Sequence, residues 1–175
     1  MILLCIDIQK GITDDRLYDF DTFRTNTLAL IAAARESGVE IIHFRHDDGP
    51  GTGFSVGDDD FEYAPGFAPA DGERHYIKTI NSCFGNKEFA AYLEGTGEDT
   101  LMIVGLQTNF CIDTTVRSAF ERGYRVIIPE GTNSTFDNAY MAKQTTYRYY
   151  NEMMWPKRFA QCVTFEEALA MIRAH

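Results

Sequence analysis

Three residues of different chemical types could act together on a carbonyl group: Asp7, Lys78 and Cys111. A cysteine becomes a nucleophile when a base takes its proton and a cation stabilises the anionic forms of both groups. Cys111 follows Thr108 and Asn109, either of which could cap a helix, and the first turn of a helix favours the thiolate form. Taken singly, these residues could equally be a capping aspartate, a solvated lysine and a buried, inert cysteine.

The elements that carry these residues predict that they meet at one edge of a sheet. Cys111 follows an apolar run over residues 101–104 and a short polar turn. Apolar residues then recur with the spacing of one helix face: Ile112, Val116, Ala119 and Phe120. Asp7 and Lys78 each close a strand-like run. Open α/β sheets bind ligands beyond the carboxyl ends of their strands, so the three side chains could flank one crevice.

Strand-like and helix-like patterns alternate along the chain. Strands are expected over residues 2–7, 39–44, 75–78, 100–104, 124–128 and 159–163. Helices are expected over residues 21–37, from a cap at Asn86 to a stop at Gly95, up to about Gly123, over residues 138–154, and after the capping box of Thr164 and Glu167. This alternation predicts an α/β fold, a doubly wound three-layer αβα sandwich around a six-stranded parallel sheet. Residues 1–175 suit one domain.

One connection, over residues 45–74, is unusually long. Connections in compact domains typically have about 4–6 residues, and much longer ones are usually functional or disordered. Disorder is one interpretation of this segment. The aromatic residues interspersed along it favour a loop that packs down and walls a site: Phe54, Phe61, Tyr63 and Phe67.

Composition restricts the partners and the compartment. The net charge of −10 argues against binding to nucleic acid or to an anionic membrane. No apolar stretch approaches the roughly 18 residues of a membrane-spanning helix, and the first residues are typical of a buried strand rather than a signal peptide. Four cysteines without a CxxC pair indicate neither a disulfide framework nor a structural zinc site. We therefore expect a cytoplasmic protein with a small-molecule substrate.

Three spaced motifs carry a resemblance to a known family. Asp7 and Gln9 stand in CIDIQKG, Lys78 precedes the run Asn81–Ser82–Cys83–Phe84, and Gly105 opens GLQTNFC, which ends at Cys111. In this order the motifs resemble those of the isochorismatase-like cysteine hydrolases, which include nicotinamidase and N-carbamoylsarcosine amidohydrolase. The resemblance covers nearly the whole chain.

The resemblance implies a strand order, a catalytic triad and a reaction. The expected order is 3-2-1-4-5-6. Cys111 would be the nucleophile, and Asp7 and Lys78 would complete the triad. A cis peptide bond would join Leu106 to Gln107, and the N–H groups of Gln107 and Cys111 would hold the oxyanion. The implied activity is hydrolysis of a C–N bond in a small amide, lactam or ureido compound through a thioester.

The chain departs from the nicotinamidase pattern after its second expected strand. Nicotinamidases carry an Asp-x-His element there, plus another histidine, and bind a metal, whereas this chain has the segment RHDDG. We therefore expect no metal and no cofactor. The HDDGPG and GLQT segments look similar to a branch that contains streptothricin-lactam hydrolases. Candidate substrate-binding residues are Gln9, His46, Phe84 and Phe110, although His46 could simply belong to a turn and the aromatic residues to the core.

Other functions stay open. The full Asp, Lys and Cys set favours acyl chemistry, but the vinyl-ether hydrolysis of isochorismatases proper is an alternative. A thiol redox or sensor protein using Cys111 or Cys83 belongs to a second class, and a non-catalytic binding protein to a third. The Tyr- and Met-rich segment over residues 140–155 could form an interface or pack internally. The resemblance implies a homo-oligomer, either a dimer or a tetramer.

Overall fold

A parallel sheet runs through the computed structural model, which describes residues 1–175. Its strands are β1 (Ile2–Ile6), β2 (Glu40–His46), β3 (Arg74–Lys78), β4 (Thr100–Leu106), β5 (Arg125–Pro129), β6 (Asn133–Ser134) and β7 (Gln161–Val163). The order β3-β2-β1-β4-β5-β7 confirms the predicted topology, because β7 is the sixth of the expected strands. The two-residue strand β6 pairs with β4 and was not predicted.

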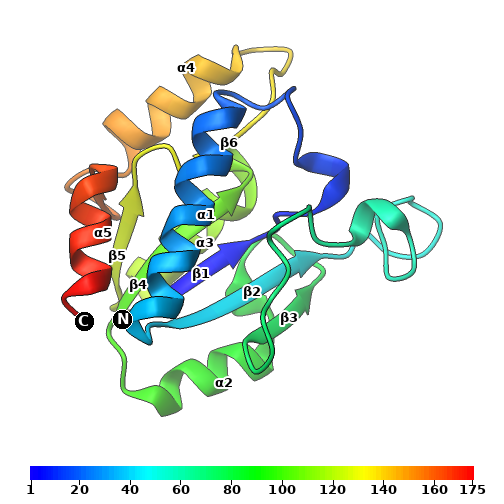
Figure 1. Ribbon diagram of the computed structural model, residues 1–175. Helices are drawn as coiled ribbons and strands as arrows, with labels where there is room; N and C mark the ends of the chain where they lie inside the picture. The colour runs from blue at the N-terminus through cyan, green and yellow to red at the C-terminus, as the bar shows by residue number, and fades with distance from the viewer.

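Helices cover both faces of the sheet, as expected for a three-layer sandwich (Figure 1). They are α1 (Phe20–Ser37), α2 (Lys87–Thr96), α3 (Asp113–Glu121), α4 (Lys143–Arg148) and α5 (Phe165–Arg173). Helices α1 and α5 pack on one face, and α2 and α3 pack on the other. None of the helices combines the length and the hydropathy that crossing a membrane requires.

The core lies in two layers because the side chains of each strand alternate between the two faces. In β1, Leu3 and Cys5 face the layer of α1 and α5, whereas Leu4 and Ile6 face the layer of α2 and α3. Every residue of this strand is buried, as expected for a central strand of a parallel sheet. The unbroken apolar runs of the sequence therefore correspond to strands covered on both sides.

Local capping signals were mostly correct. The Asn86 side chain caps α2, and Thr164 and Glu167 form the predicted capping box. Helix α2 continues through Gly95, which helices tolerate at a modest cost, and ends before Gly97, whose φ of +72° is the left-handed conformation of a typical helix stop.

The helix predicted over residues 138–154 is shorter than expected. Only α4 is α-helical, and a π-helical turn, Tyr149–Met154, extends it. The Asn138 side chain accepts hydrogen bonds from the backbone N–H groups of Tyr140 and Met141. Such local bonds compete with helical ones, so the segment before α4 forms a turn instead.

The long connection packs against the body of the protein, as predicted. It spans residues 47–73 between β2 and β3 and contains a short 3₁₀ turn (Asp59–Phe61). The part up to this turn forms the lobe at the right of Figure 1, and the rest runs back across the molecule to the start of β3. Phe61 and Phe67 are fully buried. These two aromatic side chains anchor the loop, so that the residues before them can form part of a wall.

Candidate active site

Asp7 lies directly beyond the carboxyl end of β1. Its backbone N–H donates to the carbonyl oxygen of Phe44 in β2, and its φ of +53° is left-handed. This conformation is uncommon for residues other than glycine, although aspartate tolerates it better than most. The turn holds the carboxylate at the edge where β1 and β4 meet, where it is almost completely buried.

Lys78 brings an ammonium group to Asp7 from the outermost strand. It ends β3, and its side chain is fully buried. Its Nζ atom lies 2.7 Å from Oδ2 of Asp7, 3.2 Å from Sγ of Cys111 and 3.0 Å from Nδ1 of His46. An ammonium group has three hydrogens, so each can bond to one of these acceptors.

Cys111 is held by a turn that differs from the predicted helix start. It lies in a π-helical turn, residues 108–112, between β4 and α3. Neither Thr108 nor Asn109 caps this turn, which corrects the prediction. The Thr108 hydroxyl donates to Oδ1 of Asn133, and the Thr135 hydroxyl donates to Oδ1 of Asn109. Both side chains therefore tie the turn to the segment around β6.

The turn can approach Asp7 because Gly105 has no side chain. A Cβ atom on Gly105 would lie 2.0 Å from the carbonyl oxygen of Ile6, and its φ is +126°. Only glycine allows such an approach between β4 and β1. The peptide bond between Leu106 and Gln107 is cis, as the resemblance implied.

Burial and charge control the protonation of the three groups. Burial raises the pKa of Asp7 above its ordinary value, although the ammonium of Lys78 opposes this shift. Burial disfavours the charge of Lys78, but Asp7 and the neighbouring cysteines outweigh it and raise the lysine pKa. Burial and the Asp7 carboxylate also raise the pKa of Cys111. These shifts favour the thiol form of Cys111, opposite to the direction expected from a helix start.

Asp7 and Cys111 open into a cavity of about 290 Å³. Its walls are formed by Asp7, Ile12, His46, Asp48, Phe54, Asn81, Leu106, Gln107, Phe110 and Cys111. Cys111 is 8% exposed, and the second oxygen of Asp7, Oδ1, is buried without a hydrogen-bond partner. A buried acceptor of this kind is available to a reacting group.

Two of the four predicted substrate-binding residues line this cavity, namely His46 and Phe110. Gln9 does not. Its fully buried amide accepts from the backbone N–H of His46 and donates to the carbonyl oxygens of His46 and Phe61, so it fastens the long loop to β2. Phe84 packs among aromatic side chains of the core, away from the cavity.

Asn81 and Asp48 also belong to the site, although they were not proposed as site residues. Oδ1 of Asn81 lies 3.7 Å from Sγ of Cys111, and Oδ1 of Asp48 lies 3.1 Å from Nε2 of His46. The signal for Asn81 was its place in the motif that follows Lys78. Asp48 gave none, because its Asp-Gly-Pro context is typical of a turn.

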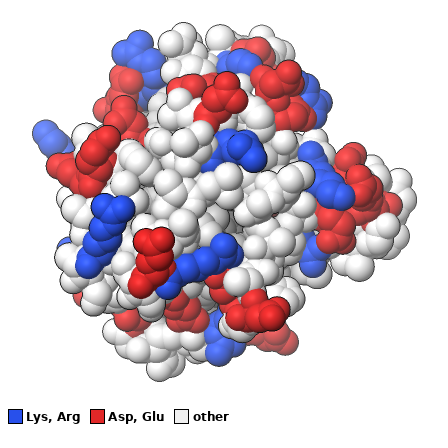
Figure 2. Space-filling model, viewed as in Figure 1, with Lys and Arg blue, Asp and Glu red and all other residues white.

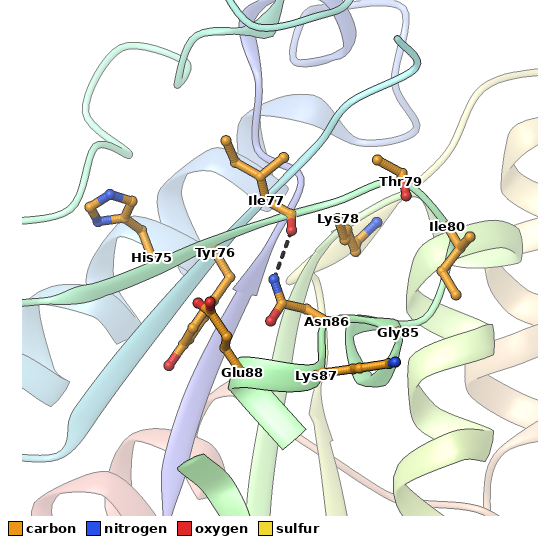
Figure 3. A pocket seen from close by; sticks show the side chains of 10 residues that line it. All are labelled: His75, Tyr76, Ile77, Lys78, Thr79, Ile80, Gly85, Asn86, Lys87 and Glu88. Carbon is orange, nitrogen blue, oxygen red and sulfur yellow. Dashed lines mark hydrogen bonds between the residues drawn. The ribbon is translucent and has the colours of Figure 1, made fainter. Parts of the chain in front are cut away.

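A larger hollow lies elsewhere, along the outer edge of β3 (Figure 3). Its volume is about 670 Å³, and the Asn86 amide donates to the carbonyl oxygen of Ile77 within it. Lys78 contributes to this wall, but its amino group bonds to Asp7 and Cys111, which do not line the hollow. The edge hollow therefore lacks the reactive groups.

A metal ion does not fit between the donor atoms of the site. Asp7, His46 and Cys111 each offer one ligand atom, and these atoms lie within 4.8 Å of one another. The ammonium of Lys78 already contacts all three residues. A second cation at that position would be repelled at short range.

The fold is a doubly wound α/β sheet, and proteins with this fold bind small ligands at the carboxyl ends of their strands. An acid, an amine and a thiol meet at that edge in this chain. Residues 1–167 match the model of the isochorismatase domain. The chain therefore belongs to the isochorismatase family of hydrolases.

The chain is similar to proteins with named activities and to solved structures. A streptothricin hydrolase from Streptomyces noursei is 26% identical over 137 residues, which cover 77% of this chain and 50% of that protein. The match thus spans about half the length of that relative. The ureidoacrylate amidohydrolase RutB of Azorhizobium caulinodans is 25% identical over 171 residues, 81% of this chain and 74% of that protein. The crystal structure of an isochorismatase from Pseudomonas putida shares 27% identity and a TM-score of 0.88, covering 95% of this chain and 88% of that one.

Proposed function

We propose that the protein hydrolyses a C–N bond of a small amide, lactam or ureido compound, with Cys111 as nucleophile and Asp7 as general acid and base. One observation carries the proposal: the Lys78 ammonium bonds to both Asp7 and Cys111, while Oδ1 of Asp7 is free and buried beside the cavity. This arrangement supplies a base, a nucleophile and a cation that balances either anion.

In the first half-reaction, Asp7 takes the thiol proton of Cys111 as sulfur attacks the carbonyl carbon. A C–S bond forms, and the carbonyl π electrons move to oxygen. When the carbonyl re-forms, the C–N bond breaks and Asp7 returns the proton to nitrogen, so that an amine leaves and a thioester remains. The raised pKa of Asp7 suits both directions of this transfer, because an effective acid–base group titrates near the working pH.

In the second half-reaction, Asp7 takes a proton from water as the water oxygen attacks the thioester carbon. The C–S bond then breaks, the sulfur regains the proton, and a carboxylic acid leaves. Overall, one amide and one water give one acid and one amine. Lys78 stays protonated throughout, since its three contacts stabilise the charged form.

The oxyanion of each tetrahedral intermediate requires donors near Cys111. We assign this role to the backbone N–H groups of Gln107 and Cys111, because both residues line the cavity. Loss of one such donor typically costs about 2.7–4 kcal/mol of transition-state stabilisation.

The relatives and the cysteine environments support hydrolysis over redox sensing. The streptothricin hydrolase and the ureidoacrylate amidohydrolase have names that fit C–N substrates. Redox-sensing cysteines are typically exposed, with a low pKa. Here Cys83 is fully buried, with its pKa raised to about 12, and the pKa of Cys111 is raised as well.

Ammonia or amine release from a panel of carboxamides, lactams and ureido compounds tests the proposal. At least one class should turn over, and Cys111→Ser should lower kcat by about 10³-fold or more, as removal of a nucleophile does in other hydrolases. Cys162→Ser is the matched control, because Cys162 lies on β7 outside the cavity. No turnover across the panel, or turnover unaffected by Cys111→Ser, would refute the proposal.

A further inference from the structure

The charges around the cavity bear on which substrates it accepts. None of its ten lining residues is Lys or Arg, whereas Asp7 and Asp48 are both acidic. The Asp7 charge is balanced by Lys78. The carboxylate of Asp48 is 55% exposed, and the one basic side chain within 4 Å of it is the imidazole of His46, whose Nδ1 accepts from Lys78. A substrate group that reaches Asp48 therefore meets a negative charge that no cation compensates.

The long loop carries further negative charge, part of it in the segment that contributes Asp48 and Phe54 to the cavity wall. Residues 47–73 contain eight Asp or Glu residues and no Lys or Arg. Three of these acids pair with Lys or Arg residues of other elements: Asp59, Glu62 and Glu73. The acidic side chains gather on the lobe at the right of the molecule, with basic ones beside them (Figure 2). Clefts lined by one sign of charge raise the local concentration of ligands of the opposite sign.

Two aromatic side chains complete the wall. Phe54, from the loop, and Phe110, next to the nucleophile, both line the cavity, and Phe110 is 51% exposed. Aromatic rings attract organic cations through their faces. A carboxylate combined with aromatic walls is the environment that suits an ammonium or guanidinium group, whereas a substrate carboxylate would find no charged partner there.

We propose that the substrate is a cationic amide or lactam, whose positive group lies toward Asp48 when its carbonyl carbon faces Cys111. This inference rests on the proposed function and narrows it. It disfavours substrates that carry carboxylates, including isochorismate, with two, and ureidoacrylate, with one. Oδ1 of Asp7, which is buried in the same cavity without a hydrogen-bond partner, leaves an acceptor beside the reacting end of such a substrate.

Charged thiol reagents test the inference without requiring turnover. Ethyltrimethylammonium and ethylsulfonate methanethiosulfonates both transfer their S-alkyl group to a cysteine, forming a disulfide and releasing methanesulfinate. The rates at Cys111 are followed by peptide mass spectrometry and divided by those for free cysteine. We expect the cationic reagent to be favoured about tenfold or more at low salt, with the preference reduced in high salt. A ratio near one, or a preference for the anion, would overturn the inference.

Variants locate the source of the preference. Asp48→Asn should lower the cation-to-anion ratio about three- to tenfold, as expected for one charge at close range in a partly solvated site. Asp47→Asn is the matched control, because Asp47 does not line the cavity and its carboxylate accepts from the backbone N–H of Gly49. An equal fall in both variants, or no fall in Asp48→Asn, would contradict the role of Asp48.

Turnover of a matched amide series separates this inference from the proposed function. The series δ-aminovaleramide, hexanamide and adipamate differs only in the charge of the terminal group. We expect kcat/KM to fall in that order. Equal kcat/KM values would refute the charge preference and leave hydrolysis intact. Reagent selectivity at Cys111 without hydrolysis of any amide would refute hydrolysis and leave the charge preference intact.

Discussion

Nδ1 of His46 lies 3.0 Å from Nζ of Lys78, on the side of the imidazole opposite Asp48. Because the ammonium can only donate, Nδ1 accepts, and the ring hydrogen is therefore on Nε2, which lies 3.1 Å from Oδ1 of Asp48. His46 thus accepts the third hydrogen of Lys78 and fixes the direction of its amino group. The Gln9 side chain fixes the backbone of His46, because it bonds to both the N–H and the carbonyl oxygen of that residue.

Removing this acceptor should weaken the positioning of Lys78. We expect His46→Ala to lower kcat about tenfold with a smaller change in KM, because a hydrogen bond to a charged group contributes about 1.5–3 kcal/mol. His46→Asn, whose amide oxygen can replace Nδ1, should recover most of the loss. His75→Asn is the matched control on the exposed side of β3. Wild-type kcat in His46→Ala would show that the contact is incidental.

The Asp7–Lys78 pair should be essential for stability as well as for catalysis. Lys78→Met leaves a buried carboxylate without its partner, and losses of this kind typically cost about 3–5 kcal/mol. Urea denaturation should show this decrease in the free energy of unfolding. The double variant Asp7→Asn with Lys78→Met should be more stable than Lys78→Met alone, and the exposed Lys87→Met should be neutral. If Lys78→Met were as stable as the wild type, the pair could not be buried as described.

The activity should have an acid limb set by Asp7. Catalysis needs the ionised carboxylate, so kcat/KM should fall as the pH falls through the pKa of Asp7. Burial raises that pKa above the ordinary value of 3.8, so the midpoint of the limb should lie above 3.8. Stopped assays, with circular dichroism as a check on folding, measure this profile. An acid limb at or below 3.8 in folded protein would exclude Asp7 as the base.

Glu73 should make stability depend on pH at the end of the long loop. Its carboxylate accepts from Arg35, His43 and the backbone N–H of Ala70, and the Arg35 hydrogen bond chiefly lowers its pKa to about 2. Because the folded pKa lies below the ordinary value of 4.5, this stabilisation is complete above 4.5 and is lost as the pH falls toward 2.

Glu73→Gln should therefore lower the free energy of unfolding at neutral pH by about 1.5–3 kcal/mol, the range for hydrogen bonds to charged groups. The difference from wild type should shrink between pH 4.5 and 2. Asp71→Asn, at an exposed position of the same loop, is the control and should show no such trend. A difference that did not vary with pH would assign the loss to packing instead of charge.

Sequence patterns predicted the long elements because strands and helices that bury apolar faces have a local period. The segment around β6 has no such period. It is a run of buried polar residues whose hydrogen bonds reach Thr108 and Asn109, so only the folded chain reveals it. The same long-range bonds explain why the helix start at Cys111 was predicted incorrectly.

The residues of the site could be predicted from the sequence more readily than their protonation could. Strand ends and the family motifs pointed to Asp7, Lys78 and Cys111, and the structure brings these side chains together. The shift in the thiol pKa depends on burial and on Asp7, which the sequence does not show. Likewise, a buried amide such as Gln9 looks like a ligand-binding group until its backbone partners are known.

Oligomerisation stays a prediction. In the segment over residues 140–155, Trp155 is fully buried, whereas Tyr140 is 95% exposed and Met153 is 58% exposed. Light scattering would test whether this surface joins copies of the chain, since a molar mass equal to that of one chain would remove the prediction.

Acylation of Cys111 can be detected from the mass of the protein after rapid acid quench during turnover of an amide. Acid quench preserves a thioester, so we expect a fraction of protein heavier by the mass of the acyl group, with the increment on the peptide that contains Cys111. Turnover with no acylated protein, or with the acyl group on another residue, would show that Cys111 is not the nucleophile.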